Sequence, residues 1–379
     1  MHYFDYNATA PLLPVARDAW LEANANCRYN ASSPYRAAAR VRCHLENSRT
    51  QLAELLGCDP KDLIFNSGAT EANNAIFCAL ARHYPAPARV LLSPIEHPCV
   101  MAAAQAYFGD RIDYLPVSAE GRVEIDTLEK LLSDPNIILV SIMAANNETG
   151  VIQPWAEALE ICRKQGRWFH CDAAQWLGKR PTAGLGNCDF LTGSAHKFGG
   201  PQGVGFLRVP PTFSGFSSLL GGEQEGGRRA GTEDYPSISA MVTALAWIEA
   251  NSLPGLQKQT LWHKAFEDRL CESIPALRII GRSHERLYNT TMAIMPEHLN
   301  MRWVLQMDKR GFQISNGSAC ATGKTGPSPV LRALGISDEE ALRAIRISSG
   351  WQTTAEEWSL LTDALKAVEQ ELHTSPELT

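Results

Sequence analysis

A lysine in a glycine-rich turn is the first residue of this 379-residue chain whose setting suggests chemistry. Lys197 stands in the stretch SAHKFGGP, directly after the apolar run CDFLTG, so the pattern places it just past the end of a strand. An amine at such a position is accessible to a carbonyl group, and partial burial makes a lysine more nucleophilic by lowering its pKa. A lone lysine after a strand is usually only a solvated charge, so the other residues near it must show whether Lys197 has a chemical role.

An aspartate in a matching position supplies the partner that a carbonyl cofactor needs. Asp172 ends the earlier apolar run RWFHCD and is followed by the small residues Ala173 and Ala174. A carboxylate at a strand tip keeps a pyridine nitrogen protonated, and the charged ring then withdraws electrons from a bound substrate. Lys197 and Asp172 at neighbouring strand ends therefore predict a cofactor site.

The stretch SGATEA, residues 67–72, follows the apolar run LIF and could bind an anion. Small residues at a strand-to-helix turn let backbone N–H groups approach a phosphate at the helix N-terminus, and the Thr70 hydroxyl adds a donor. Taken alone, the stretch is more simply explained as a capping box. Both interpretations are open at this point.

Cys320 is the one of the ten cysteines with the setting of a reactive thiol. The ten include no C-x-x-C pair and no clustering with histidine at zinc-ligand spacing, so no metal site is predicted. Most stand in apolar or helical text, as Cys78 does in AIFCALA, and are interpreted as small buried hydrophobes. Cys320 stands instead in the polar segment ISNGSACATGKTGP, which predicts a loop, and the nearby Lys324 would favour its thiolate.

Alternating strands and helices must position these residues. Between residues 62 and 209, the apolar runs LIF, RVLLS, IILVSIM, RWFHCD, CDFLTG and GVGFLRV alternate with helical patterns such as PWAEALEICRKQG. This alternation predicts an α/β fold whose largely parallel sheet is covered on both faces and binds ligands at the carboxyl ends of its strands.

A second set of elements follows the glycine-rich loop GGEQEGGRRAGTEDYP and a helix that begins near residue 237. It contains the strand-like runs LRII, NTTMAIM, FQIS and AIRIS and the helical runs MRWVLQMDKR and TAEEWSLLTDALKAVEQEL. We expect a large domain over residues 13–250 and a small domain built from residues 1–12 and 251–379.

Composition is that of an ordinary globular enzyme. The chain is 45% hydrophobic and 20% charged, its formal net charge is −6, and no block of Lys or Arg appears. We therefore expect no direct nucleic-acid binding. Polar residues interrupt every apolar stretch, and the N-terminal MHYFDYNATAPLLP lacks a secretory pattern, so the expected location is cytoplasmic, without a membrane partner.

Many ordered blocks of the chain resemble the class V aminotransferases, and within them the cysteine desulfurases of the NifS/IscS type. The blocks are FDYNATAP, FNSGATEANN, PIEHPCV, VSIMAANNETGVIQP, FHCDAAQWLGK, DFLTGSAHKFGGPQGVGFL, GGEQEGGRRAGTEDYP, SNGSACATG, PSPVLRALGIS and IRISSG. The resemblance implies fold type I of the pyridoxal-phosphate (PLP) dependent transferases: a large domain with a mostly parallel sheet between helices, plus a smaller α/β C-terminal domain.

The resemblance also implies a role for each matching position. Lys197 would hold pyridoxal 5'-phosphate as a Schiff base, Asp172 would pair with the pyridine nitrogen, and His97 would stack over the ring. Gln175 would contact the phenolic oxygen, and Asn147 would contact the substrate and the ring oxygen. The phosphate would be held by Ala69, Thr70, Ser194 and His196, and Thr232 would reach the phosphate of the other subunit of a homodimer. Arg346 would bind the substrate carboxylate with help from Asn30. His97 beside Pro98 could instead begin a helix, and Arg346 could form a structural ion pair.

The implied reaction removes sulfur from L-cysteine. It gives L-alanine and a persulfide on Cys320, which passes to a sulfur-acceptor protein in iron–sulfur cluster assembly, tRNA thiolation or another sulfur pathway. Two alternatives stay open: a selenocysteine lyase or other class V lyase in which Cys320 is selective or incidental, and a scaffold protein without activity. The chain departs from the family pattern N-P-S-S-x-H at residues 30–35, where Ala31 and Tyr35 stand, and near the cysteine at Asn316 and Gly326.

Overall fold

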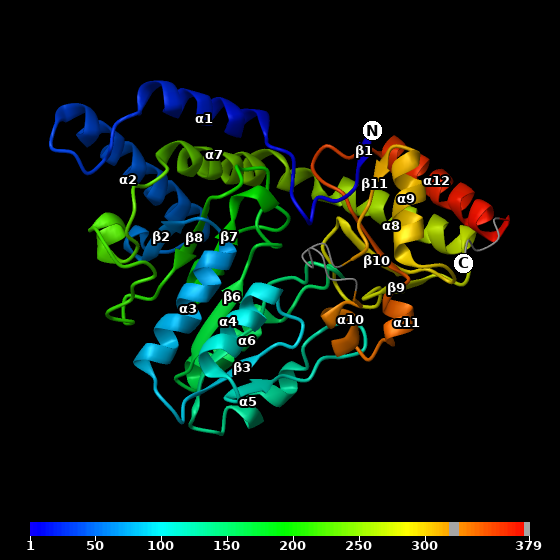
Figure 1. The fold of residues 1–379 in the computed structure, drawn as a ribbon, viewed down its shortest axis with the longest axis horizontal. Coiled ribbons are helices and arrows are strands. Elements are labelled where there is room, and N and C mark those ends of the chain that lie inside the picture. The colour runs from blue at the N-terminus through cyan, green and yellow to red at the C-terminus, as the bar shows by residue number, and fades with distance from the viewer. Residues whose placement is uncertain (318–325, 375–379) are drawn as a thin grey trace.

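A seven-stranded sheet forms the centre of the larger of two lobes (Figure 1). The computed structural model describes residues 1–317 and 326–374. In sheet order, the strands are β2 (Leu63–Asn66), β8 (Gly205–Arg208), β7 (Phe190–Ser194), β6 (Trp168–Asp172), β5 (Ile137–Ser141), β3 (Arg89–Leu92) and β4 (Ile112–Tyr114). Only β8 runs antiparallel to its neighbours, so the predicted α/β fold with a mostly parallel sheet is confirmed. The short strand β4 escaped prediction because its residues are only partly buried.

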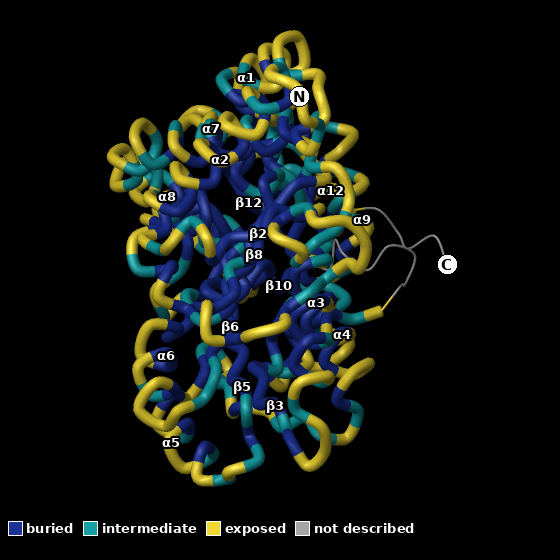
Figure 2. The backbone as a smooth tube through the Cα atoms, turned by 90° about the vertical axis from the view of Figure 1, so that its left-hand side faces the viewer, coloured by how far each residue is buried: buried dark blue, intermediate teal, exposed yellow. Residues whose placement is uncertain are grey.

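Helices cover both faces of this sheet. They are α1 (Pro14–Asn26), α2 (Arg36–Leu56), α3 (Ala69–His83), α4 (Pro98–Phe108), α5 (Leu128–Leu131), α6 (Trp155–Lys164) and α7 (Tyr235–Asn251). Along β2, Leu63 and Phe65 belong to the buried cluster that includes residues of α1, α2, α6 and α7, whereas Ile64 belongs to the cluster that includes residues of α3 and α4. This alternation follows from the two-residue period of a strand. Figure 2 shows the buried strands in the interior and the exposed segments around them.

A three-stranded antiparallel sheet forms the smaller lobe. Its strands are β9 (Arg278–Ile280), β10 (Thr290–Ile294) and β12 (Ala344–Ser348), and the helices of this part of the chain are α8 (Leu256–Ser273), α9 (Asn300–Lys309), α10 (Pro329–Ala333), α11 (Asp338–Ala341) and α12 (Ala355–Thr374). Ala293 faces α8, α9 and α12, and its neighbours Met292 and Ile294 face α10 and α11. Each lobe therefore has its own buried core.

The N-terminal strand joins the smaller lobe. Strand β1 (His2–Tyr3) pairs in parallel with β11 (Phe312–Gln313), and Phe4 belongs to the core of that lobe. This pairing supports the predicted assignment of the first residues to the small domain. The boundaries at residues 12 and 250 stay a prediction.

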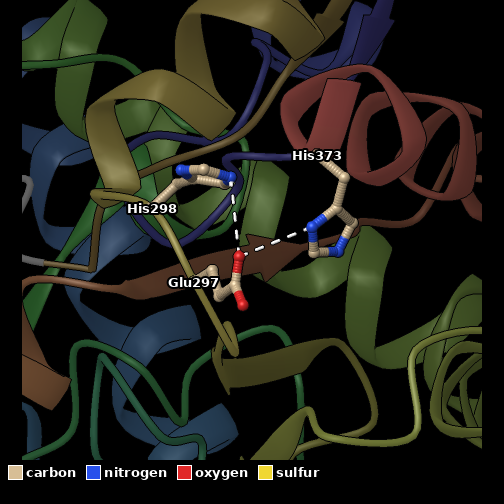
Figure 3. Close-up of side chains that lie close together, drawn as sticks. All are labelled: Glu297, His298 and His373. Carbon is tan, nitrogen blue, oxygen red and sulfur yellow. Dashed lines mark ion pairs between the residues drawn. The ribbon is translucent and has the colours of Figure 1, made fainter. Parts of the chain in front are cut away.

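A cluster of two histidines and a glutamate links α12 to the loop before α9 (Figure 3). The Glu297 carboxylate lies 3.4 Å from Nδ1 of His373 and 4.0 Å from Nε2 of His298. Nδ1 of His298 accepts a hydrogen bond from Arg302. An imidazole whose Nδ1 accepts carries its proton on Nε2, so the His298 atom that faces Glu297 is a donor. The closer contact of this cluster is the one between Glu297 and His373.

The cysteines divide by burial. Cys99, Cys162, Cys171 and Cys188 are buried, as expected for small hydrophobic side chains. Cys43 is exposed, because it lies on the solvent side of the amphipathic α2, and Cys78 is partly exposed. Cys27, Cys58 and Cys271 are also partly exposed, so the interpretation of most cysteines, Cys78 among them, as buried residues was wrong. Within the described ranges, no helix combines the length and apolar character that a membrane span needs.

Candidate active site

A cavity of about 470 Å³ gathers most of the predicted site residues. They come from the ends of strands and the starts of helices in the larger lobe, and from β12 in the smaller one. The predicted residues that line it are Ala69, Thr70, His97, Asn147, Asp172, Gln175, Ser194, His196, Lys197 and Arg346.

Neighbouring parallel strands bring Lys197 and Asp172 together. Asp172 is the last residue of β6, and Ser194 is the last residue of β7, which pairs with β6. Lys197 follows in the single helical turn Ala195–Lys197. The carboxyl ends of parallel strands share one edge of a sheet, which is why residues so far apart in sequence line one cavity.

Two hydrogen bonds fix the Asp172 carboxylate. Asn73 donates from Nδ2 to Oδ2 at 2.9 Å, and the Ala174 backbone N–H donates to Oδ1 at 3.0 Å. The residue is only 5% exposed. A buried, doubly held carboxylate at the cavity wall is suited to pair with a ring N–H⁺. Asn73 was missed by sequence reasoning, although it stands in the block FNSGATEANN.

The N-terminal segment forms a wall of the cavity that the sequence did not predict. The Lys197 amine donates to the backbone oxygens of Asn7 and Ala8, each at 2.8 Å. The Thr9 hydroxyl lies 3.2 Å from Nδ1 of His196. Burial lowers the pKa of His196 to about 4, and the positive charge of Lys197 adds to the effect, so the ring is neutral at pH 7. The block FDYNATAP was visible, but backbone acceptors leave no signal in residue types.

The start of α3 has an open anion site. Gly68 is its N-cap residue, has a φ of 134°, and offers no side-chain cap. A side chain there would also crowd Ser194, whose Oγ lies 3.2 Å from the position of a Cβ. The Glu71 carboxylate accepts from the Ser67 N–H and from Arg229. The capping-box interpretation is therefore wrong, and the first-turn N–H groups are left for a ligand.

His97 begins a helix, which is one of its two proposed interpretations. It is the N-cap of α4, and its Nδ1 accepts from the Cys99 backbone N–H at 3.2 Å. The same residue lines the cavity. The cap restrains the orientation of the imidazole, so a helix-start histidine and a ring-stacking histidine are compatible here.

Arg346 is also both an ion-pair residue and a cavity residue. It is 1% exposed, and it donates to Oδ1 of Asp5 at 2.7 Å and to the backbone oxygen of Asn147 at 3.1 Å. In the described part of the chain, Nε of Arg346 and Oδ1 of Asn147 are buried without a hydrogen-bond partner. Unpaired buried polar atoms are costly, so both atoms are suited to a ligand.

Three predicted residues are not placed in this cavity. Thr232 is exposed in the glycine-rich loop, and Asn30 is exposed and accepts from the Ser32 N–H at 2.8 Å. Cys320 lies outside the described residues. The roles of these residues stay predictions, as do the effects of Ala31, Tyr35, Asn316 and Gly326.

The lining residues fit pyridoxal phosphate. The cavity combines an amine for the aldehyde, a fixed carboxylate for the ring nitrogen, and an uncapped helix start for the phosphate. It also contains the unpaired amide oxygen of Asn147. These four features define the site of a PLP-dependent enzyme of fold type I.

The comparisons agree with this class. The chain belongs to the aminotransferase class-V family, whose model matches residues 2–361. It is 35% identical to the cysteine desulfurase of Klebsiella pneumoniae over 94% of this chain and 89% of that protein. Among solved structures, a NifS-like protein is similar with a TM-score of 0.88 and 29% identity, over 99% of this chain and 100% of that one. A structure of SspA in complex with cysteine has a TM-score of 0.81 and 28% identity, covering 93% and 100% of the two chains.

A buried carboxyl beside the site makes stability depend on pH. Burial raises the pKa of Glu96 from 4.5 to about 8, and the charge of Asp172 adds to the rise. Oε1 accepts from the Met143 N–H at 2.6 Å. A carboxyl whose pKa is higher in the folded chain stabilises the fold fully below its unfolded pKa, and this stabilisation is lost as the pH rises through the folded pKa.

We therefore expect Glu96→Gln to gain stability relative to the unmodified chain as the pH rises from 5 to 8. The relative gain should approach the order of 3–5 kcal/mol. Melting temperatures at several pH values measure it. Glu22→Gln, at an exposed position on α1, is the control and should show no such trend. Parallel pH curves for Glu96→Gln and the unmodified chain would contradict the assignment.

Proposed function

We propose that the protein is a cysteine desulfurase that uses pyridoxal phosphate to remove sulfur from L-cysteine. The observation that carries the proposal is one cavity that joins Lys197, Asp172 and the open start of α3. The family membership and the cysteine desulfurases among its relatives support it.

The chain's residues divide the work of binding the cofactor. Lys197 would attach it, Asp172 would hold its ring nitrogen, His97 would cover the ring face, and Gln175 and Asn147 would contact the phenolic oxygen of the ring. The phosphate binds at Ala69, Thr70, Ser194 and His196. When bound, the cofactor supplies an electron sink for the substrate's α-carbon.

Arg346 and Lys197 act on the substrate itself. The guanidinium of Arg346 binds the substrate carboxylate, sharing its donors with Asp5 and the Asn147 oxygen. Once displaced, the Lys197 amine accepts the α-proton, and later returns a proton to carbon. The backbone oxygens of Asn7 and Ala8 hold this amine in place.

The Cys320 thiolate attacks the substrate sulfur. A sulfur–sulfur bond forms, the carbon–sulfur bond breaks, and its electron pair stays on the carbon fragment, which takes up a proton and leaves as L-alanine. The sulfur remains on Cys320 as a persulfide, so L-cysteine and a thiol are converted to L-alanine and a persulfide.

Intact-mass spectrometry tests the proposal. After addition of L-cysteine without reductant, we expect the mass of one sulfur atom on the chain, and peptide mapping should place it on Cys320. Prior alkylation of Cys320 should prevent the gain. Release of alanine without any sulfur adduct would favour a selenocysteine lyase or another class V lyase, and no turnover at all would favour a scaffold protein.

A homodimer and a sulfur acceptor complete the proposal. Thr232 is exposed on the glycine-rich loop, and its proposed role is to contact the phosphate bound by the other subunit. Iron–sulfur cluster assembly and tRNA thiolation are the candidate destinations of the sulfur. A cytoplasmic location stays a prediction.

A further inference from the structure

Lys179 is a buried lysine beside the cavity that the proposed mechanism does not use. It is 4% exposed, and it does not line the cavity. Its amine donates to Oε1 of Gln175 at 2.8 Å and to the backbone oxygen of Gln175 at 3.3 Å. Within residues 1–317 and 326–374, these are its hydrogen bonds, so both acceptors of this amine belong to one residue.

Burying this amine is costly, which argues against an incidental position. Burial, together with the positive charges of Lys197 and Arg346, lowers the pKa of Lys179 to about 7. The turn that carries it is tightly packed, because Gly178 has a φ of 74° and a side chain there would lie 2.5 Å from Cβ of Phe198. A buried amine without a carboxylate partner is retained at a cost to stability.

The contact determines which way the Gln175 amide points. An amide group has an oxygen that accepts and a nitrogen that donates. Nζ of Lys179 donates to Oε1 of Gln175, so the amide faces Lys179 with its oxygen. The amide nitrogen is then directed to the other side, where it donates to the Asn7 backbone oxygen at 3.0 Å. The same oxygen accepts from Lys197 at 2.8 Å, so the nitrogen lies beside the reactive amine.

We propose that Lys179 is a positioning residue, which holds the Gln175 side chain with its N–H group toward the cavity as a donor to the cofactor's ring oxygen. The inference rests on the proposed function, because that function places the ring oxygen at Gln175. Without Lys179, the amide can rotate and present its oxygen, and two acceptors would then face each other.

Lys179→Met tests this role, because methionine fills similar space without a donor. We expect the dissociation constant for pyridoxal phosphate to rise about fivefold to tenfold, the loss of one hydrogen bond. The pH midpoint of the visible absorption of the loaded enzyme should also rise by roughly one unit, since the ring oxygen loses a donor. Arg180→Met is the matched control. Arg180 is the next cation along the chain, but its guanidinium donates to Glu285 and to the backbone oxygen of Arg286.

A double-mutant cycle separates positioning from the simple loss of a charge. In a Gln175→Leu background, Lys179→Met should leave the dissociation constant unchanged. Additive effects, or a variant that matches the unmodified enzyme, would overturn the inference. Lys179→Gln, which is too short to hold the amide, replaces the methionine variant if that variant does not fold. If the unmodified chain binds no pyridoxal phosphate, the proposed function fails instead.

Discussion

Replacing Cys320 by alanine is expected to abolish the release of alanine from L-cysteine, to below about 0.1% of the original rate. The carbon–sulfur bond breaks only when a nucleophile takes the sulfur, and the proposed site assigns that role to this thiolate. The measurement is alanine formation with L-cysteine as substrate. Binding of pyridoxal phosphate should be unchanged, because each predicted cofactor contact comes from another residue.

The exposed cysteine on α2 provides the matched control. Cys43→Ala removes an accessible thiol from the surface of the larger lobe and should keep full turnover. Selenocysteine is the second substrate to test. If Cys320→Ala loses cysteine turnover but retains selenocysteine turnover, the thiol acts as a selectivity residue, and the lyase alternative replaces the desulfurase.

Strand-end residues were predictable from the sequence because of how parallel sheets are built. Apolar runs identified β6 and β7, and the last residues of neighbouring parallel strands must share one edge. Asp172 and Lys197 could therefore be paired from their positions alone. By contrast, β4 is short and half-buried, so its apolar pattern was too weak to be recognised as a strand.

The parts that escaped prediction depend on long-range contacts. Lys197 donates to the backbone oxygens of Asn7 and Ala8. Every residue has a backbone oxygen, whatever its side chain, so no residue type marks this site in the sequence. The role of Lys179 was also not predictable, because a lysine in a sequence is normally expected to be a solvated charge and only the fold shows that this one is buried. The stretch at residues 67–72 shows the opposite error. A local capping pattern was present, but α3 begins at Gly68 without a side-chain cap, and Glu71 accepts from the Ser67 N–H and from Arg229.

Three basic groups lie in or beside the cavity. Lys197 and Arg346 lie close enough to Lys179 to lower its pKa, and Asp5 partly balances their charge by accepting from Arg346. Binding of a phosphate and a substrate carboxylate would reduce this repulsion. The site is therefore expected to gain stability when it is loaded, since a ligand that binds only the folded state stabilises it.

Lys197→Ala is expected to lower the conversion of L-cysteine to L-alanine at least about a thousandfold, because the chain loses both the attachment point and the group that moves the α-proton. Alanine formation measures this loss. Borohydride treatment followed by peptide mapping measures attachment directly, and the cofactor should be found on the AHKFGG peptide of the unmodified chain and on no peptide of the variant.

Lys179 is the residue that could contradict this prediction. Its pKa of about 7 makes it a nucleophilic amine at neutral pH, and it lies on the same side of the sheet, in the turn that follows β6. It does not line the cavity, however, and its hydrogen bonds to Gln175 occupy it. Labelling of the Lys179 peptide in unmodified enzyme would exchange the roles of the two lysines. Labelling there only in Lys197→Ala would show instead that the buried amine can reach the cofactor once its competitor is gone. The exposed Lys264→Ala serves as the control and should retain both turnover and the label on Lys197.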